Sequence, residues 1–130
     1  SSDPVRLCHA YQRATAHDLF ADPGAVEPDL AVCELENERP GALQAWAGAL
    51  FDAIGDWDYR QAARKVRAPA LVVQGQSDRI TPPSGAETWA GLLPDAKLLR
   101  LPATGYIPLR ERPQRTAEAV ERFLSEGDPR

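Results

Sequence analysis

The feature that most constrains the fold of this chain is the alternation of strand-like and helix-like runs after residue 68. ALVVQG, residues 70–75, is a short β-branched apolar run bounded by a proline and a turn, as buried parallel strands are. The pattern then predicts a helix over 84–93, a strand over 96–102 and an amphipathic helix over 113–124. This order favours an α/β fold with parallel strands and right-handed crossovers. Because two strands do not make a stable sheet, we expect their open edges to need neighbours that these residues do not supply.

The residues before about position 60 have a helical pattern instead. We predict helices over 5–20, 30–38 and 41–54, the last of them ending at a glycine. Six apolar side chains share one face of the third helix, namely Leu43, Trp46, Ala47, Leu50, Phe51 and Ile54. We expect this stripe to be core, and the alternative is the lining of an apolar pocket. The apolar positions of the first helix are Leu7, Tyr11, Ala14 and Leu19, and those expected to face inward from the last helix are Ala117, Val120, Phe123 and Leu124.

Composition excludes several classes of function. The formal net charge is −4 and the sequence pI is about 5.1, which argues against nucleic acid or an anionic membrane surface as the main partner. No apolar run approaches the length that spans a bilayer, and no signal peptide opens the chain. Cys8 and Cys33 do not make a disulfide framework and lack metal-ligand spacing, so we expect reduced thiols in a cytoplasmic protein. We predict neither a metal site nor a cofactor.

Two polar residues follow the predicted strands. Asp78 lies in the loop after the first strand, and Tyr106 lies in the loop after the second, within PATGYIPLRERP. Functional groups of open parallel sheets sit on loops beyond the carboxyl ends of the strands, and adjacent strands would bring these two loops together. A carboxylate and a second polar group in that arrangement can form an acid–base relay. The structural alternatives are a turn or cap around Thr81 for Asp78, and half-buried packing for Tyr106.

The stretch over residues 57–124 also resembles the C-terminal segment of α/β-hydrolase-fold proteins, most of all the proline iminopeptidase-like branch. The strand and loop that carry the catalytic acid of that family are matched by Val66, Pro69, Leu71, Val73, Gly75 and Asp78. The stretch that carries its catalytic histidine is matched by Leu101, Pro102, Gly105, Glu111 and Pro113, with Tyr106 at the histidine position. The resemblance implies a helical cap or lid segment over residues 1–60 and a core segment over 61–130.

The same resemblance implies that the rest of the active site lies elsewhere. The nucleophile of the family sits on a G-x-S-x-G turn, and no such pattern occurs in these 130 residues. The chain contains no methionine and opens SSDP, which indicates a tag scar or a proteolytic cut. We therefore expect an N-terminal partner chain that carries the nucleophile, this chain being the C-terminal piece of a cleaved or two-chain protein. A fragment is one alternative, and an N-terminal nucleophile at Ser1 is another.

A tyrosine at the histidine position changes the chemistry that the family would perform. Imidazole titrates near pH 6.5 and phenol near about pH 10, so Tyr106 cannot simply accept a serine proton and hand it on. Three interpretations stay open. Hydrolysis is lost and a ligand cavity is kept; or the phenol donates a hydrogen bond or a proton in a non-hydrolytic step such as a cyclisation; or another group, such as His9 or His17, replaces the histidine.

The sequence thus predicts an α/β-hydrolase-like enzyme with Asp78 and Tyr106 as catalytic residues. Its substrate would be a small apolar molecule that undergoes ester or amide hydrolysis or a related step. The alanine-, arginine- and proline-rich composition is typical of a high-GC bacterial source, where such proteins serve in small-molecule biosynthesis. The competing hypothesis is a catalytically inactive binding or scaffold protein built on the same fold.

Overall fold

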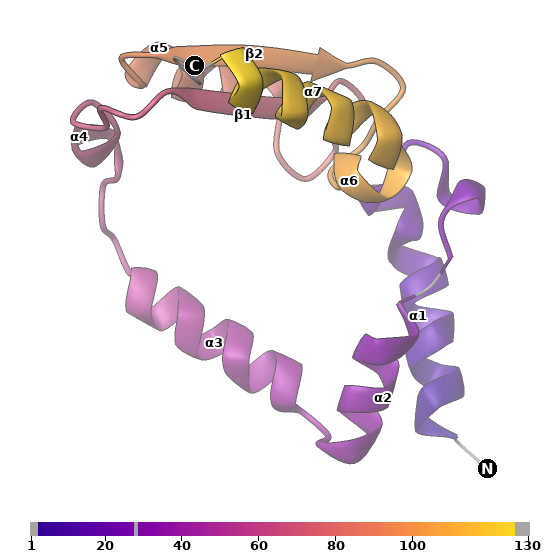
Figure 1. The fold of residues 1–130 in the computed structure, drawn as a ribbon. Coiled ribbons are helices and arrows are strands. Elements are labelled where there is room, and N and C mark those ends of the chain that lie inside the picture. The colour runs from indigo at the N-terminus through magenta and orange to yellow at the C-terminus, as the bar shows by residue number, and fades with distance from the viewer. Residues whose placement is uncertain (1–2, 28, 127–130) are drawn as a thin grey trace. The chain divides into compact units, whose positions relative to one another are not determined.

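The computed structural model describes residues 3–27 and 29–126. In chain order its elements are α1 (Pro4–Leu19), the 3-10 turn η1 (Pro23–Ala25), α2 (Leu30–Glu38), α3 (Ala42–Ile54), α4 (Arg60–Ala63), β1 (Ala70–Gly75), α5 (Pro83–Leu92), β2 (Ala96–Leu101), α6 (Pro108–Glu111) and α7 (Pro113–Glu126) (Figure 1). The described residues form two compact units. Unit 1 takes in those of Ser1–Ala16 and Glu27–Asp58, and unit 2 takes in those of His17–Val26 and Tyr59–Arg130.

Unit 2 contains a two-stranded parallel sheet, so the prediction of an α/β fold is confirmed. β1 and β2 pair with Ala70 opposite Ala96 and with Gly75 opposite Leu101. α5 packs against both strands, and α6 contacts β1 and α7. In Figure 1, α5 lies behind the strands and α7 crosses in front of them. Because the strands are parallel and in register, the loops that follow them leave the sheet at the same end.

Two fully buried residues of the described part of unit 2 lie at that end of the sheet. Leu101, the last residue of β2, and Thr104, in the loop beyond it, are fully buried. Ala63 of α4 and Ala86 of α5 are buried as well. Phe20, which follows α1, is also buried and belongs to this unit. The core of unit 2 therefore lies beside the loops that the sequence singles out.

The inward face predicted for α7 is largely wrong. Val120 is 38% exposed and Leu124 is 65% exposed, Ala117 is exposed, and Phe123 is half-buried. The buried residue of this helix is Thr116, whose hydroxyl donates to the carbonyl of Pro108 at 3.2 Å. An amphipathic pattern shows which face can be buried, but burial also needs a neighbouring layer, and the described residues do not provide one.

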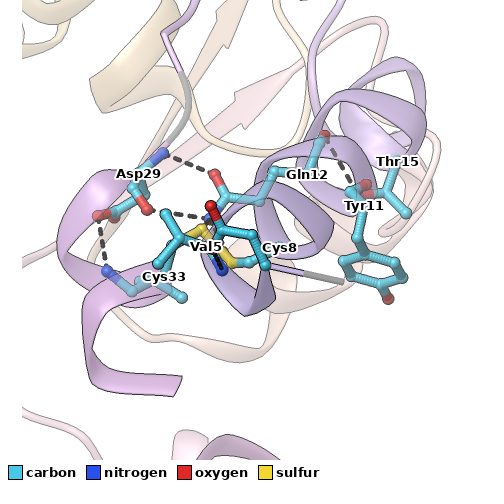
Figure 2. Close-up of a disulfide and its surroundings, with 9 residues drawn as sticks. Val5, Cys8, Tyr11, Gln12, Thr15, Asp29 and Cys33 are labelled. Carbon is cyan, nitrogen blue, oxygen red and sulfur yellow. Dashed lines mark hydrogen bonds between the residues drawn. A yellow bond between two sulfur atoms is a disulfide. The ribbon is translucent and has the colours of Figure 1, made fainter. Parts of the chain in front are cut away.

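A disulfide between Cys8 and Cys33 ties α1 to α2 in unit 1, so the prediction of two reduced thiols is wrong (Figure 2). Gln12 joins the same two helices: its Oε1 accepts from the backbone N of Asp29 at 2.6 Å, and its Nε2 donates to the Asp29 carbonyl at 3.0 Å. Asp29 in turn caps α2, because its side chain accepts from the backbone N of Val32. Disulfides persist mainly in oxidising compartments, so the expectation of a cytoplasmic protein loses the support that it drew from the cysteines.

The apolar faces of unit 1 are also more open than predicted. In α3 the exposed fractions are 66% for Trp46, 41% for Leu50 and 72% for Phe51, so these members of the stripe predicted as core are not covered by the described residues. Ala47 and Ile54 are half-buried, and the side chain of Leu43 lies outside the description. In α1, Leu7 and Tyr11 are exposed, and the buried residue is Ala16. No helix within residues 3–27 and 29–126 is long and apolar enough to cross a bilayer.

Candidate active site

The Asp78 carboxylate is held by hydrogen bonds from its own loop and strand. Asp78 is half-buried and lies three residues beyond the last residue of β1. Its Oδ1 accepts the backbone N–H groups of Ile80 at 2.8 Å and Thr81 at 2.9 Å, while its Oδ2 accepts Nε2 of the buried Gln74 at 3.0 Å. An ionised carboxylate offers about four acceptor positions, so Oδ2 retains room for a further donor. The turn-forming role that the sequence allowed is present, and it also fixes the orientation of the carboxylate.

Tyr106 lies in the loop that follows β2. Its backbone N donates to the Leu19 carbonyl at 2.7 Å, and the backbone N of Gly105 donates to Oε2 of Glu111. Hydrogen bonds from the backbone amides of both Gly105 and Tyr106 thus fix the backbone that leads into Tyr106. The tyrosine itself is 44% exposed, so the described residues do not enclose it.

The structure brings the Asp78 loop and the Tyr106 loop into direct contact. The backbone N of Ser77 donates to the carbonyl of the buried Thr104 at 2.9 Å. A Cβ added at Gly75 would lie 2.1 Å from the Gly105 carbonyl oxygen and 2.4 Å from that of Thr104. Glycine at position 75 is therefore required by the close approach of the second loop, and the juxtaposition expected from the strand order is present in the backbone.

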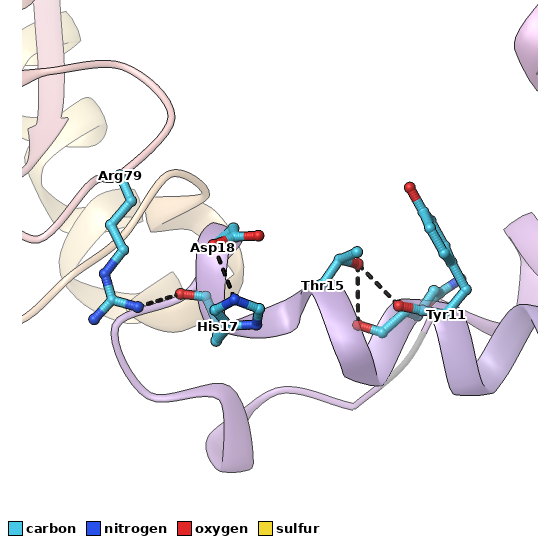
Figure 3. Close-up of polar contacts among 6 residues, drawn as sticks. Tyr11, Thr15, His17, Asp18 and Arg79 are labelled. Atoms are coloured by element: carbon cyan, nitrogen blue, oxygen red, sulfur yellow. Dashed lines mark hydrogen bonds and ion pairs between the residues drawn. The ribbon is translucent and has the colours of Figure 1, made fainter.

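Both loops also contact residues 17–20, the last residues of α1 and the first residue beyond it. Nη1 of Arg79, next to Asp78, donates to the His17 carbonyl at 2.6 Å (Figure 3). On the side of the second loop, the Arg110 guanidinium lies over the ring of Phe20, 5.4 Å from its centroid, within the range of a cation–π contact. A Cβ added at Gly105 would meet the Leu19 carbonyl oxygen at 2.6 Å, so the backbone of this segment is packed directly against the loop.

The two histidines that the sequence offered as replacements are placed differently. His17 Nε2 lies 3.1 Å from Oδ1 of Asp18, and its side chain is 62% exposed. Nε2 of His9, in unit 1, is buried without a hydrogen-bond partner. Ser1, the other alternative, lies outside the described residues. Across the described ranges no group of three or more His, Cys, Asp or Glu residues could hold a metal ion.

Sequence reasoning missed three residues that build this site. Glu111 was noted only as a match to the motif of the second loop, yet its carboxylate accepts from the backbone of Ala21 and Gly105. Gln74 was included only as part of the predicted strand, and Arg79 was given no role. A polar residue inside an otherwise apolar strand was the available signal for Gln74, because a buried amide needs partners.

Comparison with known proteins fits this geometry. Residues 44–129 match the model of the TAP-like protein family. The chain belongs to that family of α/β-hydrolase-fold proteins. It is 36% identical over 91 residues to a pimeloyl-[acyl-carrier protein] methyl ester esterase of Aromatoleum aromaticum, covering 70% of this chain and 35% of that protein. It is 34% identical over 119 residues to a 2-hydroxymuconate semialdehyde hydrolase of Pseudomonas putida, covering 85% of this chain and 42% of that protein.

Solved structures show the same likeness. A serine hydrolase involved in carbazole degradation, the CarC enzyme, superposes with a TM-score of 0.70 at 25% identity, over 95% of this chain and 48% of that one. A bacterial membrane phospholipase A superposes with a TM-score of 0.71 at 23% identity, over 95% of this chain and 39% of that one, which bears on the fold alone. The chain spans about a third of the length of the esterase relatives that it matches. The predicted α/β-hydrolase fold is confirmed.

Proposed function

We propose that this chain is the C-terminal part of an α/β-hydrolase-type enzyme that acts on an ester or amide of a small apolar substrate. The observation that supports the proposal is the contact between the Asp78 loop and the Tyr106 loop at the carboxyl ends of two paired strands. Relatives named as esterase and hydrolase support the reaction class. The proline iminopeptidase-like branch remains a prediction from the sequence motifs.

In this proposal Asp78 orients the acid–base group and Tyr106 occupies the place of that group. The fixed carboxylate of Asp78 retains an acceptor position on Oδ2. Tyr106 is not enclosed by the described residues, and its phenol can donate a hydrogen bond or a proton to an oxygen of the substrate. A phenol is a poor base at neutral pH, so a step that needs a donor, such as a cyclisation, suits it better than activation of a serine.

The proposal includes an N-terminal partner that carries the nucleophile and the remaining strands. β1 pairs only with β2 among the described residues, which leaves one of its edges without a strand. A groove of about 360 Å³ runs beside β1 and α5 and is lined by apolar side chains that include Leu71, Val72, Trp89 and Leu93. An unpaired strand edge beside an apolar groove is the surface that a neighbouring strand and its layer would cover. The relatives contain further sequence beyond the part that this chain matches, which fits strands supplied from outside these residues.

Tyr106 itself favours one other function. A binding or scaffold protein on this fold would keep the Asp78 turn and both glycines of the loop contact for structural reasons alone. It would have no need of a base at position 106. Turnover by the protein with tyrosine at position 106 separates the two functions, whereas restoring a base there tests the assignment of the position.

The test is ester hydrolysis by the whole protein, N-terminal part included, with p-nitrophenyl acetate and butyrate. In a protein that keeps its nucleophile, Tyr106→His should raise kcat/KM by about a hundredfold or more, the usual contribution of a positioned general base. Asp78→Asn in that background should remove most of the gain. Tyr11→His, at a tyrosine that is 70% exposed on α1, is the matched control and should change nothing. A Tyr106→His variant no faster than this control would refute the assignment of position 106.

A further inference from the structure

The Glu111 carboxylate is the most densely bonded buried charge in the described part of unit 2. It is 8% exposed and ends the short helix α6, five residues beyond Tyr106. Its Oε1 accepts the backbone N–H groups of Ala21 at 2.7 Å and Asp22 at 3.2 Å. Its Oε2 accepts the backbone N–H group of Gly105. Burying a carboxylate is costly unless its oxygens are paired, and here backbone amides from two separate segments pair them.

These bonds connect the peptide just before Tyr106 to the segment just after α1. The connection is reinforced from the other direction, because the backbone N of Tyr106 donates to the Leu19 carbonyl at 2.7 Å. The Tyr106 loop and residues 19–22 are thus joined by the Glu111 side chain and by the backbone hydrogen bond from Tyr106 to Leu19. The hydrogen bonds of the Glu111 carboxylate among the described residues go to backbone amides and not to the phenol of Tyr106, so any effect on chemistry would pass through the backbone that carries the phenol.

We propose that Glu111 is a positioning residue for the side chain at position 106. It clamps the Tyr106 loop to residues 21–22 and so fixes where the acid–base group stands relative to Asp78. The catalytic part of this inference rests on the proposed function, whereas the clamp itself does not. A residue that only braces α7 would not need an acceptor for Gly105, Ala21 and Asp22 together.

Glu111→Gln is the sharpest substitution because it preserves shape and removes one acceptor. Whichever way the new amide turns, its NH₂ group faces either the Gly105 amide or the Ala21 and Asp22 amides, and a donor then meets a donor. The matched control is Glu87→Gln, the same chemical change at an exposed glutamate that pairs with Arg100 at 2.7 Å in the same unit. Glu111→Asp is a second variant, which keeps the charge but is too short to span both segments.

Amide hydrogen exchange of the full protein tests the clamp directly. In Glu111→Gln, the amides of Ala21, Asp22, Gly105 and Tyr106 should exchange at least tenfold faster than in the unsubstituted protein. The amides of β1 and β2 should keep their rates within twofold, as they should everywhere in Glu87→Gln. Unchanged rates at the four amides would overturn the proposal. So would equal acceleration in the strands, because Glu111 would then be a residue of general stability.

Two further measurements keep the result decisive. Should Glu111→Gln fail to fold, the clamp can be measured in the unsubstituted protein by NMR scalar couplings across its hydrogen bonds. These couplings join the backbone nitrogens of Ala21 and Gly105 to the side-chain carboxyl carbon of Glu111. Their absence would refute it. Where the protein turns over an ester, Glu111→Gln should lower kcat about tenfold with KM within twofold, and a change in KM alone would contradict positioning. A protein with no turnover would count against the proposed function, while the exchange rates would still decide the clamp.

Discussion

Gly75→Ala is the substitution that measures how firmly the two site loops are pressed together. The added Cβ would lie 2.1 Å from the Gly105 carbonyl oxygen, whereas real Cβ atoms essentially never approach within 3.0 Å, so something must move by about 0.9 Å, the difference between the two distances. The obstacle is backbone, and it cannot turn aside as a flexible side chain does. Overpacking costs about 1–3 kcal/mol, and we expect the upper end of that range at this position.

Urea unfolding followed by circular dichroism gives the free energy of unfolding. The control is Gly91→Ala in α5, where an added Cβ meets nothing within 4 Å. Alanine is favoured over glycine inside helices, so the control should gain up to about 1 kcal/mol. The same chemical change is thus expected to have opposite signs at the two positions. A loss below about 1 kcal/mol for Gly75→Ala would refute the contact between the loops, because so small a cost does not fit a backbone clash.

Two further predictions concern the remaining contacts. The loop closed by Cys8 and Cys33 spans 25 residues, for which chain entropy gives about 3.5 kcal/mol, so Cys8→Ala with Cys33→Ala should lower the free energy of unfolding of unit 1 by up to that amount. A urea midpoint for unit 1 that is indifferent to reducing agent would contradict this. The hydrogen bond and the positive charge of Lys97 lower the pKa of Glu126, so Lys97→Gln should raise that pKa towards its ordinary value in a carboxyl NMR titration. A lowered pKa in the folded state stabilises the fold at pH values above the unfolded pKa. The contribution of the Lys97–Glu126 pair to the free energy of unfolding should therefore be present at neutral pH and be lost as the pH falls through the folded pKa. An unchanged titration of Glu126 in Lys97→Gln would refute the pairing.

The strands and the long helices could be predicted from local pattern because each carries its own signal. The run over 70–75 is a strand with the bounds that were predicted. The start of α5 is set by Pro83, because proline is favoured at the first position of a helix. α4 and α6 were not predicted, since four-residue helices have too few turns to show a periodicity. Burial was predicted less well, because an apolar stripe shows only which face can be covered.

The candidate site was predictable as a pair of loops and not as a set of hydrogen bonds. Strand order alone places Asp78 and Tyr106 at the same end of the sheet. The partner of Glu111, by contrast, lies 90 residues away at Ala21, and no local pattern links them. The disulfide was missed for the same reason: Cys8 and Cys33 are 25 residues apart in sequence, and the geometry of the two helices that carry them decides whether the sulfurs meet.

The way the chain is divided between its units affects how the protein can be shortened. The sequence predicted a boundary near residue 60, and that cap and core division remains a prediction. In the structure His17–Val26 belongs with the sheet. A truncation that starts at Tyr59 would keep both strands and every residue of the two motifs. It would delete the carbonyls that accept from Arg79 and Tyr106 and the amides of residues 21 and 22 that donate to Glu111. A stable minimal version would have to carry this ten-residue strip, fused or added in trans, and complementation by such a peptide would be a practical route to controlling when the site is assembled.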